Sequence, residues 1–120
     1  MINVTLNNFH RQILESEIPC MLKFSRRTCS LCKGLNSVFI RLQAHYGSGI
    51  RLATIDIDMH PQILDIFDID GVPTIMVFTD GNAEELPYPE APNFYSGYGE
   101  SFLRDYIDSV SYTHLTLPTK

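Results

Sequence analysis

"CMLKFSRRTCSLCK", residues 20–33, combines a short apolar run, two arginines and two cysteines three positions apart. The run at 20–25 is bounded by proline and by charge, which predicts a buried strand interrupted by Lys23. Apolar residues then recur at helical spacing over 30–46, and YGSG follows as a stop signal. The sequence therefore predicts a strand-to-helix junction with Cys29 at the N-terminus of the helix.

The rest of the chain alternates between strand and helix patterns. Residues 83–93 hold three prolines and three glutamates, which predicts a polar loop or a weak edge strand. The order of the elements indicates an α/β domain whose central mixed β-sheet is covered by helices on both faces. The other expected strands are 4–6, 50–58 and one within 71–82 that ends at an Asp80-Gly81 turn, and the other expected helices are 9–14 after an Asn7 or Asn8 cap, 61–67 and 102–110.

Composition limits the class of protein. With 120 residues the chain is long enough for one hydrophobic core, so we expect a single domain over 1–110. A net charge of -5 argues against general binding to nucleic acids or anionic membranes, both of which need a basic face on the protein. No apolar run approaches the roughly 18 residues of a membrane span. The start MINVTLNNFHRQIL has no secretory signal pattern, so we expect a cytoplasmic protein.

The cysteine pair has a chemistry of its own. A cysteine at a helix N-terminus faces unpaired backbone N–H groups and the positive end of the helix dipole, which favour the thiolate over the thiol. Cys32 lies one turn inside the predicted helix and within bonding reach of Cys29, so it can resolve a mixed disulfide formed by Cys29. In reducing cytosol such a close pair indicates a catalytic or metal-binding role rather than a structural bridge.

Basic residues flank the pair in the sequence. Arg26 and Arg27 are expected to be exposed and screened, so each stabilises a thiolate only slightly. Lys23 would act more strongly if its ammonium were buried near a thiolate. Its long apolar stem instead favours an ammonium that reaches solvent, without a direct chemical role.

Two other interpretations of the pair stay open at this point. One is chance spacing. The other is a zinc site, which requires four ligands, although the chain has no second CxxC. Cys20 is expected in the core and the histidines at the surface or at helix caps. The further candidate zinc ligands are Cys20, His10, His45, His60 and His114.

A second motif, GVPT at 71–74, follows the β-rich TIDID and precedes IMVF and a DG turn. With the CxxC at a strand-to-helix junction, the chain resembles the thioredoxin family over about residues 3–109. The resemblance implies the thioredoxin fold, with Cys29 as the nucleophile and Cys32 as the resolving thiol.

The resemblance also implies a substrate site. It makes Pro73 a cis-proline beside the cysteine pair, and it implies that Val72 and Thr28 contact the substrate chain. It implies no organic cofactor and no metal, because the redox-active centre is the Cys29–Cys32 couple itself.

Four residues depart from the family pattern. Thioredoxins usually have Trp where this chain has Thr28, and Gly-Pro where it has Ser30-Leu31. The intervening pair helps to set the redox potential, so the strength of the reductant does not carry over. Members commonly have a buried acid at the position of Lys23, and a protonated lysine cannot act as the base that such an acid provides.

Charges near the two motifs are expected to modulate docking. Asp68 and Asp70 lie just before the GVPT motif, and Arg26 and Arg27 lie before the first cysteine. A partner with the opposite pattern of charge would bind best, and its reduction would slow at high salt.

The predicted function is that of a thiol-disulfide oxidoreductase that reduces protein disulfides and takes part in cell redox homeostasis. A reductase or a low-molecular-weight thiol is the expected electron donor, and the protein is expected to be a monomer. One alternative is a disulfide-forming or isomerising enzyme of the same fold. An alternative from another class is a weakly active binding adaptor that keeps the fold.

The tail SYTHLTLPTK, residues 111–120, has no periodicity or charge pattern. It resembles a translated sequencing-adapter peptide, so we interpret it as an artefact outside the domain.

Overall fold

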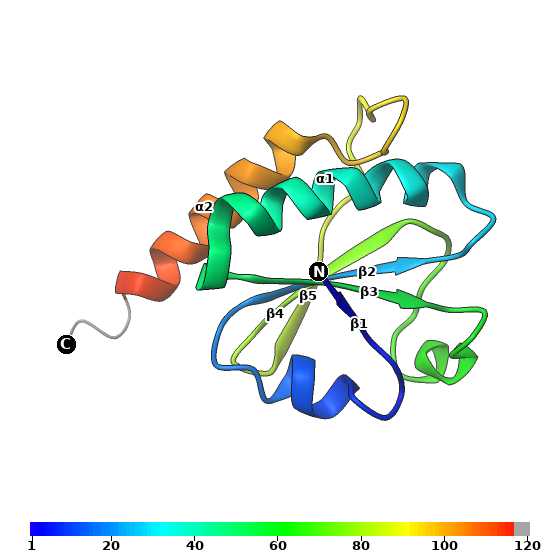
Figure 1. The fold of residues 1–120 in the computed structure, drawn as a ribbon, viewed down its shortest axis with the longest axis horizontal. Coiled ribbons are helices and arrows are strands. Elements are labelled where there is room, and N and C mark those ends of the chain that lie inside the picture. Colours follow the sequence, from blue (N-terminus) through cyan, green and yellow to red (C-terminus); the bar gives the residue numbers. More distant parts are fainter. Residues whose placement is uncertain (117–120) are drawn as a thin grey trace.

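The computed structural model describes residues 1–116, which form a five-stranded mixed sheet with the order β1-β3-β2-β4-β5 (Figure 1). Strands β1, β3 and β2 run parallel, whereas β4 pairs antiparallel with β2 and β5 antiparallel with β4. Strand β2 is therefore the central strand. The strands are β1 Ile2–Asn3, β2 Cys20–Ser25, β3 Arg51–Asp56, β4 Thr74–Thr79 and β5 Asn82–Glu85.

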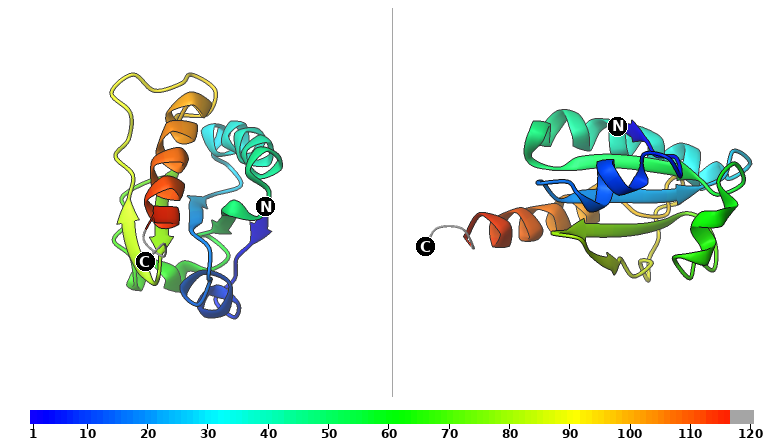
Figure 2. Two further views of the ribbon diagram at one scale, coloured as in Figure 1. Left: turned by 90° about the vertical axis from the view of Figure 1, so that its left-hand side faces the viewer. Right: turned by 90° about the horizontal axis from the view of Figure 1, so that it is seen from below.

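Helices cover both faces of this sheet, as the views in Figure 2 show. The long helices α1 (Ser30–Tyr46) and α2 (Glu100–Thr116) lie on one face. The short helices η1 (His10–Leu14) and η3 (Pro61–Asp65) lie on the other, and η2 (Gly47–Gly49) follows α1. The predicted fold class, a mixed sheet between two helical layers, is confirmed.

Strand β2 is buried on both faces because each face packs into a separate hydrophobic cluster. Met21 belongs to the cluster under α1 and α2, whereas Leu22 and Phe24 belong to the cluster under η1 and η3. Successive side chains of a strand point to opposite faces, so Lys23 shares the face of Met21. The lysine in the apolar run therefore points toward the α1 side of the sheet.

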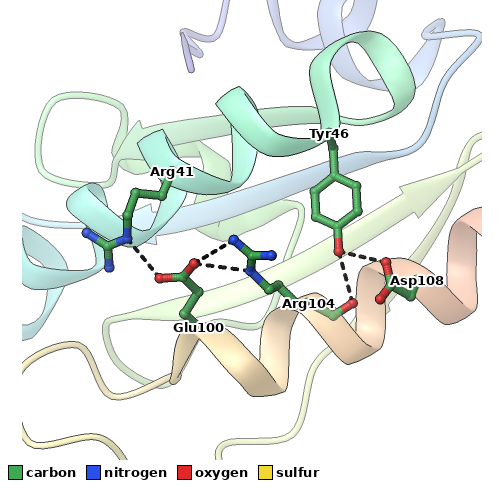
Figure 3. A network of polar contacts seen from close by, with 5 residues as sticks. All are labelled: Arg41, Tyr46, Glu100, Arg104 and Asp108. Atoms are coloured by element: carbon green, nitrogen blue, oxygen red, sulfur yellow. Dashed lines mark hydrogen bonds and ion pairs between the residues drawn. The ribbon is translucent and has the colours of Figure 1, made fainter.

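Polar contacts join the two long helices at the surface (Figure 3). The Glu100 carboxylate accepts hydrogen bonds from Arg41 Nε at 2.8 Å and from Arg104 Nε at 3.1 Å. The Tyr46 hydroxyl donates to Asp108 Oδ1 at 2.7 Å. The bonds from Arg41 to Glu100 and from Tyr46 to Asp108 hold the first half of α2 against α1, the helix that carries the cysteine pair.

The first strand differs from the prediction of a strand at 4–6. It pairs only at Ile2 and Asn3, and the last bond to β3 runs from Val4 N–H to the Thr54 carbonyl at 2.8 Å. The chain then turns because Thr5 N–H donates to Asn8 Oδ1 at 2.7 Å while Thr5 Oγ1 accepts from Asn8 N–H at 3.2 Å. This reciprocal pair of bonds turns the chain toward the following helix. The prediction of a strand at 4–6 was therefore wrong in its bounds, because the strand is Ile2–Asn3.

The remaining elements follow the sequence patterns closely. Strand β3 ends at Asp56, earlier than predicted, because the Asp56 carboxylate accepts the N–H groups of Asp58 and Met59 at 2.8 and 3.2 Å and bends the chain. The predicted turn after β4 has positive φ at Asp80 (52°) and Gly81 (82°), as a tight hairpin requires. The weak edge strand foreseen within 83–93 is β5.

Helix α2 continues to Thr116, past the boundary predicted at residue 110. The last residues of the predicted tail, 117–120, lie outside the described part of the chain. Within residues 1–116, none of the helices is both long and apolar enough to cross a membrane.

Candidate active site

The cysteine pair lies where β2 gives way to α1. Cys29 and Cys32 are joined by a disulfide, and their Cα atoms are 5.2 Å apart. Cys29 is partly exposed, whereas Cys32 is only 2% exposed. A second molecule can therefore reach the sulfur of Cys29, while the sulfur of Cys32 lies behind it.

Local hydrogen bonds set Cys29 as the N-cap of α1. Its backbone is extended (φ -89°, ψ 111°), and its Sγ accepts the N–H of Cys32 at 3.0 Å. Its own N–H donates to the Arg26 carbonyl at 3.2 Å, which closes the turn after β2. A sulfur at this position meets unpaired N–H groups and the positive end of the helix dipole, so the thiolate is favoured after reduction.

Pro73 lies at the same end of the sheet as the cysteine pair. Thr74, the first residue of β4, pairs with Phe24 near the end of β2, and β2 leads directly to the 26–29 turn. The Val72–Pro73 peptide bond is cis, Pro73 is buried and Val72 is partly exposed. A cavity of about 240 Å³ adjoins this segment and is lined by Gly71, Val72, Pro73, Thr74, Glu85, Tyr88 and Tyr98.

On the other side of β2, toward β3, a larger cavity of about 490 Å³ borders the buried cysteine. We call it the basic cavity because lysine, arginine and histidine outnumber the single carboxylate in its wall. Its charged or titratable lining residues are Lys23, Arg26, Arg27, Lys33, His60, Asp56 and Cys32, and the other lining residues include Ser25, Asn36 and Thr54.

Lys23 is only 1% exposed, so the expectation that its ammonium reaches solvent was wrong. Nζ donates to Asn36 Oδ1 at 2.5 Å and to Thr54 Oγ1 at 3.1 Å, and it lies 5.8 Å from the centre of the Phe39 ring. The register explains the error: Lys23 stands opposite Thr54 in β3, underneath α1, where polar acceptors hold the ammonium inside. Burial lowers the pKa of Lys23 to about 8.

The other predicted site residues lie at the surface around the cysteine pair, with the exception of Asp70. Arg26 and Arg27 line the basic cavity, and Arg26 Nε lies 3.5 Å from the Asp58 carboxylate. Thr28 is exposed next to Cys29 in the chain. Asp70 is exposed and lines neither of the two cavities, so the structure does not bring it to the arginines.

Sequence reasoning missed the contact between α1 and the loop at 86–99. Gly34 packs so closely on this loop that a Cβ there would overlap the Tyr95 carbonyl oxygen. Asn93 organises the loop, since its side chain accepts the N–H groups of Tyr95 and Ser96 at 2.8 and 3.2 Å. The loop presents Phe94 and Tyr95, which are 86% and 76% exposed. A glycine in the second turn of α1 was the only signal in the sequence for this approach.

Asn36 and Thr54, the two acceptors of Lys23, were also missed. Asn36 is four residues after Cys32 and so lies on the same helix face, which the spacing alone could have indicated. Cys20 is fully buried, as predicted. Among the described residues, no cluster of three or more His, Cys, Asp or Glu side chains could hold a metal ion.

Comparison with known proteins identifies the family. The thioredoxin family profile matches residues 1–93. A thioredoxin of Rickettsia felis is 29% identical over 83 residues, which are 69% of this chain and 79% of the relative. Thioredoxin 1 of a Nostoc species is 25% identical over 89 residues, 74% of this chain and 83% of the relative. A thioredoxin of Pseudomonas aeruginosa is 26% identical over 84 residues, 70% of this chain and 78% of the relative. With its Cys29–Cys32 pair at the start of α1, the chain belongs to the thioredoxin family and is a thiol-disulfide oxidoreductase.

Proposed function

We propose that the chain reduces protein disulfides, with Cys29 as the attacking thiolate and Cys32 as the resolving thiol. The observation that carries the proposal is the difference in exposure: Cys29 is partly exposed at the helix N-cap, whereas Cys32 is buried one turn behind it. Only Cys29 can meet the sulfur of a folded partner, and only Cys32 is placed to attack Cys29 from inside.

The exchange proceeds in two steps with balanced electrons and protons. The Cys29 thiolate attacks one sulfur of the substrate disulfide, and the other substrate sulfur leaves as a thiolate that takes up a proton. Cys32 then loses its proton and attacks Cys29 Sγ, which releases the second substrate thiol. The substrate gains two electrons and two protons, and the Cys29–Cys32 disulfide forms.

The substrate chain is proposed to lie along Val72 and Pro73, with Thr28 on the other side of Cys29. Val72 is partly exposed and precedes β4, so its backbone can pair with an extended peptide as an added strand would. Thr28 is exposed beside Cys29 and is smaller than the tryptophan usual in the family, so it leaves more room at the attacking sulfur.

Charged groups are proposed to tune this exchange. Lys23 acts from inside the basic cavity, whereas Arg26 and Arg27 act from its wall. Asp70, exposed before the GVPT segment, contributes to docking rather than to the thiolate. Because the arginines and Asp70 are exposed, their contribution should weaken as salt is added.

Partners and location complete the proposal. A reductase or a low-molecular-weight thiol returns the pair to the dithiol, and no organic cofactor or metal takes part, because two cysteines carry both electrons. We propose a monomer in the cytoplasm that acts in redox homeostasis and binds neither nucleic acid nor membrane, consistent with the net charge of -5. The comparisons do not favour the two alternatives, a disulfide-forming or isomerising enzyme and a binding adaptor.

Insulin reduction tests the proposed function. The unmodified chain, supplied with dithiothreitol, should reduce insulin catalytically, and Cys29→Ser should reduce it no faster than dithiothreitol alone. Cys20→Ala is the matched control, because Cys20 is buried away from the pair and its loss should leave turnover unchanged. An unmodified chain without turnover would support the adaptor instead. A reduction potential near -270 mV would indicate a reductant, and one of about -120 to -180 mV an oxidant or isomerase.

A further inference from the structure

The Lys23 ammonium is a buried charge without a charged partner among residues 1–116. It is 1% exposed, and both of its hydrogen bonds go to neutral acceptors, the Asn36 amide oxygen and the Thr54 hydroxyl. Buried charges in proteins are almost always paired, because an isolated ion loses its hydration without compensation. A counter-ion for Lys23 is therefore missing from the disulfide form.

The position of that counter-ion is indicated by the neighbours of Nζ. An ammonium has three N–H groups, and Asn36 and Thr54 take two of them. Asn36 lies one helical turn after Cys32 on α1, and side chains four apart on a helix have Cβ atoms about 5–6 Å from each other. Lys23, Asn36 and Cys32 line the same cavity. The remaining N–H group of Lys23 is therefore available to a group in the cavity that Cys32 also lines.

Other charges around the cavity do not supply the counter-ion. The only carboxylate in the lining is Asp56, on β3, and its Oδ1 already accepts the N–H groups of Asp58 and Met59. The remaining titratable groups of the lining are cationic or neutral: Lys33 from α1, Arg26 and Arg27 from the turn after β2, His60 from the segment before η3, and the amino group of Met1.

We propose that the missing counter-ion is the thiolate of Cys32, which exists only after the disulfide has opened, so that Lys23 is a positioning residue for the resolving cysteine. The proposal rests on the function given above. It predicts that Lys23 acts in the second step of exchange and that it favours the dithiol over the disulfide.

The step that Lys23 assists is balanced within the proposed cycle. In the mixed disulfide, Cys29 is bonded to the substrate, so Cys32 alone can carry the negative charge. Its proton goes to solvent, the thiolate forms beside the ammonium, and its attack on Cys29 Sγ breaks the bond to the substrate. Lys23 keeps its proton throughout and changes only the stability of the thiolate.

The first test measures the thiolate of Cys32 directly. In a Cys29→Ser background, Cys32 is the resolving cysteine without its partner, and its thiolate can be followed by ultraviolet absorbance against pH. Adding Lys23→Met should shift the midpoint upward by about one pH unit, so that about tenfold less thiolate is present at neutral pH. Lys23→Arg should restore most of the shift. Lys33→Gln, which removes an exposed cation of the same cavity, should change the midpoint far less.

The second test measures the redox equilibrium. In the full chain with both cysteines, Lys23→Met should shift the equilibrium with glutathione toward the disulfide, by up to about tenfold, or about 30 mV, at a pH where Cys32 is ionised in the dithiol form. Equal midpoints and equal equilibria in folded Lys23→Met and unmodified protein would overturn the proposal. The proposal would also be overturned if the equilibrium of the unmodified protein with glutathione changed with phosphate concentration at constant ionic strength, because the counter-ion would then come from solution.

A third measurement needs no substitution, so it holds even if Lys23→Met fails to fold. The titration of Lys23 can be followed by NMR of its side chain in the disulfide and dithiol forms of the unmodified protein. Lys23 should hold its proton to higher pH in the dithiol form, since it gains a partner there; identical titration in both forms would contradict the proposal. The protein could still reduce insulin although Cys32 and Lys23 do not affect each other's titration. That result would leave the proposed function standing and remove only the role of Lys23.

Discussion

The two sides of the Cys29–Cys32 disulfide are built from different chemistry. Toward β3, the basic cavity of about 490 Å³ is lined by cations and holds the buried Lys23. Toward β4, the cavity of about 240 Å³ is lined by the GVPT segment, Glu85 and two tyrosines of the 86–99 loop, and the same loop presents Phe94 and Tyr95 to solvent. The cationic side borders Cys32 and suits the stabilisation of charge. The aromatic side has the exposed apolar area that contacts between proteins use.

Because of this difference, the thiolates of the two cysteines can be stabilised by different groups. The attacking sulfur depends on the helix N-terminus, because it is the N-cap of α1. The resolving sulfur is buried, so its charge depends on the few groups that share its cavity. Substitutions on one side should therefore change one step of exchange and leave the other step nearly intact.

The largest expected effect comes from removing the resolving cysteine. Cys32→Ser should still attack through Cys29 but should stop as a stable mixed disulfide with its substrate, because no second thiol can release it. Gel electrophoresis without reductant, followed by mass spectrometry, would detect the trapped species. Release of substrate at the unmodified rate would mean that Cys32 is not the resolving group.

The next largest effect concerns the aromatic side. Gly34→Ala should destabilise the fold by roughly 2–3 kcal/mol, because the new methyl group overlaps the Tyr95 carbonyl and outweighs the better helix propensity of alanine. Urea unfolding measures the loss. Ser37→Ala, at an exposed position of the same helix, is the control and should be neutral or slightly stabilising. Equal stability of both variants would show that the 86–99 loop does not pack on α1 in solution.

A smaller effect follows from the buried lysine. In the disulfide form the pKa of Lys23 is about 8, below its ordinary 10.5, because burial disfavours the ammonium. Between these values the unfolded chain binds more protons than the folded one, so stability should rise with pH, by about 1–2 kcal/mol between about pH 7 and pH 10. Lys23→Met should lack this rise when unfolding is measured in urea at both pH values. A rise of the same size in Lys23→Met would assign it to other groups.

The smallest expected effect lies at the rim of the basic cavity. Reversing Arg26 and Arg27 to Glu should move the thiolate titration of Cys29 to higher pH by a few tenths of a unit, since both side chains are exposed and screened. Ultraviolet absorbance at low and at high salt measures the effect, which should shrink as salt is added. An unchanged titration at low salt would rule out a role for the arginines in activating Cys29.

The fold could be predicted from the sequence because local patterns and global order agree. The apolar run at 20–25, the helical spacing after Cys29 and the DG turn each correspond to an observed element. The first strand was misplaced because it consists of only two residues, and its bonds depend on the backbone of β3 rather than on its own side chains.

The sequence predicted the reactive residues of the site but not the residues that surround Lys23. The cysteine pair and Pro73 are marked by motifs, whereas Asn36 and Thr54 become partners of Lys23 only through strand register and helix position. Lys23 itself was predicted to reach solvent because the flexibility of a lysine stem says nothing about which helix will cover it. The approach of Tyr95 to Gly34 joins residues 61 positions apart in the chain, and no local pattern encodes such a contact.

The two open edges of the sheet have a consequence for a protein that handles partly unfolded chains. Strand β1 pairs over only two residues, and β5 is short and fully exposed, with Glu84 and Glu85 along it. Short and charged edges are poor templates for a further strand, whether from a second copy or from a misfolded client. The chain can therefore offer backbone pairing at Val72, next to the reactive sulfur, without inviting aggregation along its borders.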